Sequence, residues 1–166
     1  MKRVFVQLAT VMAMSFSASA ADRTWTGGGD GTTWGDPANW GGTAPTAGDS
    51  VVISNAVSGT TLSLVNDLGS AESPLLLDNI TLGGEGSIRL SGNPVSPSTA
   101  HTGTFLSTDC GGDGVITDFD ILFPNHATAT RVFLKSENLS WWTHNGRISA
   151  GGKTSVYLNV PSNNTA

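Results

Sequence analysis

The sequence of 166 residues has a single cysteine, Cys110, and only eight lysines and arginines. No intrachain disulfide can form, and a lone thiol cannot build a cysteine-based zinc site. The formal net charge is −5, so no basic surface is available for a phosphate backbone and we expect no nucleic-acid partner. Packing and backbone hydrogen bonds must therefore hold the fold together.

Helix signals and long apolar runs are equally scarce. After residue 20, no segment combines helical spacing of apolar residues with good helix formers, and none approaches the length of a transmembrane span. The sequence contains no G-x-S-x-G elbow, P-loop or dinucleotide fingerprint. We therefore expect a non-catalytic protein that needs no cofactor, with calcium as the one candidate ion.

Residues 1–20 have the three parts of a secretory signal peptide. Lys2 and Arg3 give a positive start, residues 4–16 are mostly apolar, and Ala18, Ser19 and Ala20 are small residues before a cleavage point. Removal of this leader takes away two positive charges and lowers the net charge to −7. The pattern predicts an exported protein located outside the cell or on its surface.

Short β-rich segments separated by glycine-rich turns fill the rest of the chain. Typical turns are residues 83–86, 111–114 and 150–152. The predicted strands are residues 50–54, 60–65, 75–77, 79–82, 87–90, 104–106, 115–117, 131–134, 147–149 and 155–160.

Two all-β architectures fit this pattern: a β-solenoid and a β-sandwich. Sandwich hairpins favour Asn-Gly or Asp-Gly turns between paired strands, whereas here glycine-rich corners separate very short strands. The strongest apolar segments, centred near Leu62, Ile80, Phe105, Phe133 and Tyr157, recur at a spacing typical of coiled β-repeats. A parallel β-helix over residues 50–166 is the preferred prediction, with the sandwich as its alternative.

Residues 21–49 form a different segment, rich in tryptophan and glycine. Trp25, Trp34 and Trp40 stand among glycines with almost no aliphatic residues around them. The first coil of a solenoid would otherwise expose its apolar interior and unpaired backbone groups. We therefore predict that this segment caps the N-terminal end, and that its glycines let the backbone fold tightly.

The order of these tryptophans carries a resemblance to a known family. The run TWTGGGDGTTWGDPANWGGTAPTAGDSVVIS (residues 24–54), with the strands that follow as far as Asn93, resembles bacterial secreted proteins of the autotransporter-associated β-strand repeat type. The resemblance implies the N-terminal part of a β-helical passenger without a catalytic site. It further implies a structural or adhesin-like role in contact with an extracellular glycan or a host or matrix surface.

The C-terminal residues depart from that family's pattern. Residues 161–166 include neither a barrel of amphipathic strands nor an apolar sorting tail. The expectation is that residues 50–166 are an incomplete set of coils and that the chain is a fragment. The location would be the outer membrane if a C-terminal anchor exists.

One segment has the spacing of a calcium loop. Counted from Asp109, its candidate ligands are Asp109, Asp113, the carbonyl of Val115, Thr117 and Asp120, with Gly114 at the sharp turn. Position 3 is a glycine, and a proline lies where an outgoing helix would continue. An acidic turn between two coils is the alternative interpretation, and these departures favour it.

Two further candidates concern carbohydrates. Trp141 and Trp142, with His144 and Asn145, could stack on sugar rings, although adjacent tryptophans in a strand point to opposite faces. The alternatives are therefore a sugar-binding module and plain packing at a corner. The cluster of Asp113, Asp118 and Asp120 leaves a polysaccharide-active enzyme as a third hypothesis.

Overall fold

The computed structural model describes residues 20–98, 102–112, 114–137 and 141–159, so the predicted leader lies outside the described part. Among the described residues, no helix has the length and apolar character needed to cross a membrane. The elements in order are β1 (Asp22–Thr24), η1 (Pro37–Trp40, a 3-10 helix), β2 (Ser50–Ser54), β3 (Thr61–Asn66), β4 (Leu75–Leu77), β5 (Ile80–Gly84), β6 (Ser87–Gly92), β7 (Val95–Pro97), β8 (Gly103–Cys110), β9 (Val115–Thr117), β10 (Ile121–Ser136), β11 (Trp142–His144) and β12 (Ile148–Asn159).

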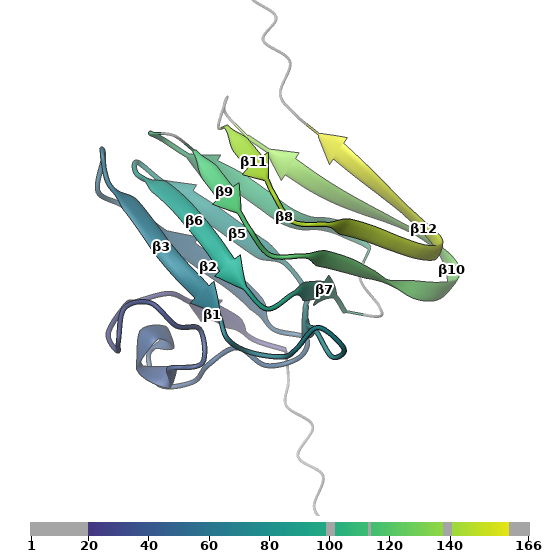
Figure 1. Cartoon of the computed structure of the whole chain (residues 1–166), viewed down its shortest axis with the longest axis horizontal. Helices are drawn as coiled ribbons and strands as arrows, with labels where there is room; N and C mark the ends of the chain where they lie inside the picture. The colour runs from purple at the N-terminus through teal and green to yellow at the C-terminus, as the bar shows by residue number, and fades with distance from the viewer. Residues whose placement is uncertain (1–19, 99–101, 113, 138–140, 160–166) are drawn as a thin grey trace, which may run out of the picture.

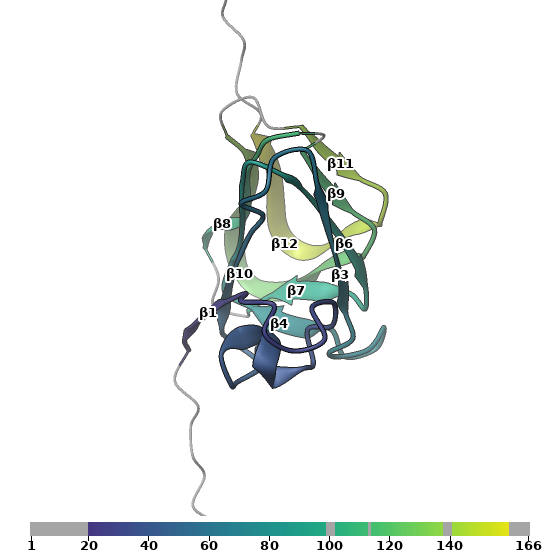
Figure 2. The same ribbon diagram turned by 90° about the vertical axis from the view of Figure 1, so that its left-hand side faces the viewer.

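The strands form three parallel ladders, which are the three faces of one solenoid (Figures 1 and 2). Face 1 contains β1, β2, β5, β8 and the C-terminal parts of β10 and β12. Face 2 contains β3, β6, β9 and β11. Face 3 contains β4, β7 and the N-terminal parts of β10 and β12. Seen from the N-terminal end, these faces enclose a three-sided interior (Figure 2).

The register on face 1 shows how the coils follow one another. Val51 pairs with Ile80, Ile80 with Leu106, Leu106 with Leu134, and Leu134 with Leu158. Equivalent residues are therefore 24 to 29 positions apart in sequence, and every ladder is parallel. Parallel pairing of successive coils confirms the predicted β-helix and excludes the β-sandwich, whose neighbouring strands would run antiparallel.

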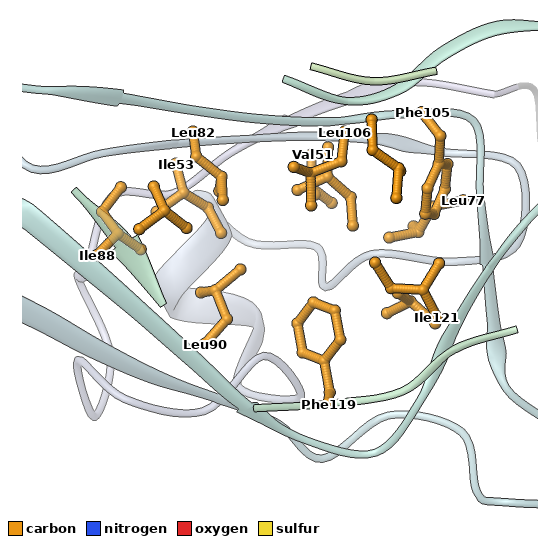
Figure 3. Close-up of a cluster of buried hydrophobic side chains, with 14 of the residues drawn as sticks. Val51, Ile53, Leu77, Leu82, Ile88, Leu90, Phe105, Leu106, Phe119 and Ile121 are labelled. Atoms are coloured by element: carbon orange, nitrogen blue, oxygen red, sulfur yellow. The ribbon is translucent and has the colours of Figure 1, made fainter. Parts of the chain in front are cut away.

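The interior is filled by the inward side chains of all three faces (Figure 3). Because successive side chains of a strand point to opposite faces, every second residue points inward, and along most strands these inward residues are apolar. Each fully buried aliphatic or aromatic side chain contributes about 1.5–3 kcal/mol of burial free energy. The central members of this core include Ile53, Leu64, Leu77, Leu82, Ile88, Leu90, Phe105, Phe119 and Ile121.

Glycines recur at the corners because successive coils approach each other closely there. A Cβ atom on Gly84 would lie 2.3 Å from the carbonyl oxygen of Asn55, and one on Gly92 equally close to that of Asn66. Both glycines also have positive φ angles, of 113° and 104°. The glycine-rich turns of the sequence are thus a requirement of stacking one corner directly on another.

The predicted strands largely coincide with the observed ones, with two kinds of difference. Two of the longest strands, β10 and β12, continue from face 3 around a corner onto face 1, and each absorbs segments predicted to be shorter or separate. In addition, β1, β7 and β11 were not predicted. Each has only three residues, and none is a run of aliphatic or β-branched residues such as those in β4 and β9, which are equally short but were predicted.

Candidate functional site

The tryptophan cap, defined as Trp25, Trp34 and Trp40, contributes Trp34 and Trp40 to the hydrophobic core, and the partly buried Trp25 packs against that core. Trp34 is 0% exposed and Trp40 is 6% exposed. Trp40 meets both other rings edge to face, with centroid distances of 5.0 Å to Trp25 and 5.7 Å to Trp34. Its indole N–H donates to the carbonyl of Trp34 at 2.8 Å. Rings held in this way seal the first coil and cannot serve as an open ligand platform.

The glycine-rich loop between Trp25 and Trp34 folds around Asn39. The fully buried side chain of Asn39 accepts hydrogen bonds from the backbone N–H groups of Gly29 and Gly31 and donates to Asp30 and the carbonyl of Thr33. Hydrogen bonds from the hydroxyl and backbone N–H of Thr33 hold the pKa of Asp30 far below its usual range. These polar contacts, rather than apolar ones, set the shape of the loop.

Asp49 fastens the start of the described chain to the first coil. Its carboxylate accepts from Arg23 Nε at 2.9 Å, from the backbone N–H of Ala21 at 2.8 Å and from the N–H and hydroxyl of Thr46. The Asp49 side chain is only 1% exposed. Burial by itself raises the pKa of Asp49, but these hydrogen bonds outweigh that effect and hold the pKa below its ordinary value.

The predicted calcium-loop residues lie on several elements. Asp109 is near the end of β8, Val115 and Thr117 are in β9, and Asp120 directly precedes β10. Asp113 lies outside the described residues. Within the described part, no group of three His, Cys, Asp or Glu residues is arranged to hold a metal ion.

Two of those residues already have protein partners. The hydroxyl of the fully buried Thr117 lies 2.7 Å from His144 Nδ1 and accepts from Trp142 Nε1 at 3.1 Å. Asp120 accepts from the backbone N–H of Arg147 at 2.8 Å and pairs with its guanidinium at 3.2 Å. The acidic segment therefore joins one coil to the next, and the calcium loop stays a prediction.

Asp118, a member of the candidate carboxylate cluster, is also engaged. It accepts from Asn145 at 2.8 Å and from Arg89 Nε at 2.6 Å. The hydrogen bond from Asn145, with further help from Arg89, outweighs the effect of burial and holds the pKa of Asp118 below its usual range. A carboxylate that stays ionised in this way is unsuited to act as a general acid at neutral pH.

The candidate sugar platform at Trp141 and Trp142 is divided. Trp141 is 77% exposed, whereas Trp142 is half-buried and packs near the ring of His144 at 5.8 Å. Asn145 uses its amide on Asp118. Trp142 and His144 instead line an apolar hollow of about 230 Å³ at the last described coil, together with Leu134, Ile148, Leu158 and Asn159.

The lone cysteine is not a reactive site. Cys110 is buried at the end of β8. Burial, reinforced by the negative charge of the neighbouring Asp109, raises the pKa of the Cys110 thiol to about 11. The thiol therefore stays protonated at neutral pH and is a poor nucleophile.

A second hollow, on the outer side of face 1, was missed by the sequence analysis. It has a volume of about 280 Å³ and is lined by polar side chains from β8 and β10 and from residues at and before β5. We call it the polar hollow. The sequence signal that could have found it is the pair Phe105 and Leu106, two consecutive large apolar residues inside an otherwise alternating strand. The polar side chains that line it are Asn79, Thr81, Thr104, Ser107, Lys135 and Glu137.

Comparison with known proteins adds no family to these observations. No protein-family model, no curated protein and no solved structure matches this chain.

Proposed function

We propose that this chain is part of an exported, non-catalytic β-helical protein whose outer faces make contacts outside the cell. The observation that carries the proposal is the division between inside and outside. The described interior is filled with apolar side chains, the apolar hollow lies at the open end of this interior, and the polar hollow lies on the outer side of face 1. The leader-like residues 1–20 and the resemblance to secreted β-strand repeat proteins support the same role.

The engaged carboxylates support a non-catalytic role over the polysaccharide-active alternative. A glycosidase of the usual kind needs two acidic groups, one of which must be protonated. Asp118 has a lowered pKa and Asp120 is paired with Arg147. The role proposed here is therefore to present a rigid surface that holds a partner without changing it.

Export is tested by producing the full chain in a Gram-negative host and separating its cell fractions. We expect cleavage after Ala20 and recovery of the mature chain outside the cytoplasm. A control variant with Leu8→Lys and Val11→Lys interrupts the apolar run and should leave the chain uncleaved inside the cell. Uncleaved, cytoplasmic wild-type chain would contradict the proposed function.

Surface contact is tested with the mature chain on beads, applied to plates coated with extracellular matrix proteins or polysaccharides. We expect retention on at least one coating without new reducing ends in the polysaccharides. Beads carrying the same amount of heat-unfolded chain are the control. Release of reducing ends would favour the enzyme, and equal retention of folded and unfolded chain would contradict a role for the folded surface.

A further inference from the structure

We propose that the outer side of face 1 carries a binding site for a neutral oligosaccharide, formed by the polar hollow and the adjoining rings of Phe133 and Tyr157. This inference rests on the proposed function, because it assigns a partner to one of the presented faces. Neither part of the site coincides with the tryptophans or the acidic segment singled out in the sequence.

The hollow lies beside a β-bulge in β8. Thr104 pairs with Phe133 and Leu106 with Leu134, so Phe105 is an extra residue in the ladder. Phe105 and Leu106 are both fully buried, which means that two consecutive side chains point inward. The outward residues Thr104 and Ser107 are therefore three positions apart in sequence instead of two, and both line the hollow.

The lining of the hollow offers hydrogen bonds of both kinds. Thr81, Ser107 and Lys135 occupy one row across three coils, since Thr81 pairs with Ser107 and Ser107 with Lys135. Coils in such a row are about 4.8 Å apart. Lys135 forms an ion pair with Glu137 at 2.5 Å, and each side chain is 37% exposed. Hydroxyls, an ammonium group and a carboxylate can together donate to and accept from the hydroxyl groups of a sugar.

An aromatic surface adjoins the hollow. Phe133 lies between the buried Val132 and Leu134 and therefore points outward, and Tyr157 is its register partner in the next coil. The two rings are stacked, with centroids 5.1 Å apart and planes inclined by 26°. Tyr157 is 42% exposed. Thr104, which pairs with Phe133, also lines the hollow, so the rings and the hollow share an edge.

The charge and size of the site indicate the ligand class. The two charged groups that line the hollow, Lys135 and Glu137, are paired with each other, so the hollow gives no net attraction for a phosphate or a carboxylate. Its volume of about 280 Å³ lies at the lower end of small-molecule sites, which suits one sugar ring. A neighbouring ring would place its apolar C–H groups against the exposed part of the stacked Tyr157 and Phe133 rings, as sugars do on aromatic side chains. A neutral oligosaccharide of two or more rings fits both parts.

The test is an NMR titration of the mature chain with neutral tetrasaccharides of glucose (α- and β-linked), mannose, xylose and N-acetylglucosamine. We expect at least one of them to bind and to shift the amide signals of residues 79–81, 104–107 and 133–137. A Tyr157→Ala variant should bind that sugar about 3- to 10-fold more weakly. Ser107→Arg, which fills the hollow, should abolish binding, and Trp141→Ala, directly before β11 of face 2, should leave it unchanged.

Several outcomes would overturn the inference: no binding of any neutral tetrasaccharide, shifts confined to residues around Trp141, or unchanged affinity in both face 1 variants. Circular dichroism of each variant shows whether it is folded, and Tyr157→Phe, which keeps the stack, should retain most of the affinity. An exported chain whose beads adhere but which binds none of these sugars would overturn this inference alone. A chain that stays uncleaved in the cytoplasm would overturn the proposed function, whatever its affinity for sugars.

Discussion

The two ends of the described solenoid differ in how their interior is covered. Val51 and Leu158 belong to the same ladder on face 1, at its N-terminal and C-terminal parts. Val51 is 0% exposed beside the tryptophan cap, whereas Leu158 is 65% exposed in β12. Inward position alone therefore does not bury a side chain in a β-helix. A further coil or a separate covering segment must lie over it.

The ion pairs at the two ends differ in the same way. The carboxylate of Asp49, which meets Arg23, is almost fully buried, and it accepts three further hydrogen bonds from Ala21 and Thr46. Asp120 and Arg147 are 36% and 68% exposed. A buried carboxylate with several donors loses all of them when it is replaced, whereas an exposed pair exchanges its partner for water. The N-terminal pair should therefore matter more.

The largest expected effect comes from breaking the tryptophan cap. Trp34→Ala removes a fully buried indole that packs against Trp40 and the first coil. Loss of this burial and the resulting cavity should lower the free energy of unfolding by about 3–5 kcal/mol. Urea denaturation followed by tryptophan fluorescence and far-UV circular dichroism measures the change.

The matched control for that substitution is Trp141→Ala, because Trp141 is 77% exposed. Its effect should stay within about 0.5 kcal/mol, as expected for an exposed side chain. Equal losses in the two variants would show that the buried cap contributes no more stability than an exposed ring. Any difference in stability between the two ends of the solenoid would then have to come from residues other than these tryptophans.

The next-largest expected loss of stability comes from a comparison of the same ladder position in two neighbouring coils. Leu134 is 1% exposed and pairs with Leu158 in β12. Leu134→Ala should cost about 2–5 kcal/mol, whereas Leu158→Ala should cost less than about 1 kcal/mol. Both values come from urea denaturation at pH 7. A large loss for Leu158→Ala would mean that something covers β12 in solution.

Much of the fold could be predicted because its main signals are local. Residues 50–54, 75–77 and 115–117 were predicted as strands with the observed bounds. Phe133 and Tyr157, in contrast, marked apolar segments correctly but point outward, while Val132 and Leu134 are buried. A pattern of apolar residues gives the position of a strand, but which side of it faces inward depends on the register with neighbouring coils.

The candidate sites were less predictable for the same reason. The calcium spacing treats residues 109–120 as one loop, whereas the structure places Thr117 in a strand with its hydroxyl near His144. The polar hollow brings Asn79, Ser107 and Lys135 together from three coils. No short sequence window contains them, so the pair Phe105 and Leu106 could have indicated an irregular strand, but only the coil register brings the lining residues together.

The third and smallest expected loss of stability, after those of the tryptophan cap and of Leu134, comes from breaking the ion pairs at the two ends. Asp49→Asn should lower the free energy of unfolding by about 1–3 kcal/mol at pH 7, because the amide cannot satisfy all the donors that the carboxylate binds. Asp120→Asn should cost no more than about 1 kcal/mol. Asp22→Asn in β1, a neighbouring exposed position, serves as the control. Equal effects of Asp49→Asn and Asp22→Asn would contradict a special role for the buried carboxylate.

The pH dependence of the same variants gives an independent check. Folding lowers the pKa of Asp49, so the unfolded chain takes up a proton first as the pH falls below the ordinary value of 3.8. The contribution of Asp49 is therefore fully present above that pH and decreases as the pH falls toward the pKa of the folded state. The stability difference between wild type and Asp49→Asn should shrink between pH 5 and pH 2, as measured by urea denaturation. A difference that stays constant over this range would show that the carboxylate contributes through its shape and not through its charge.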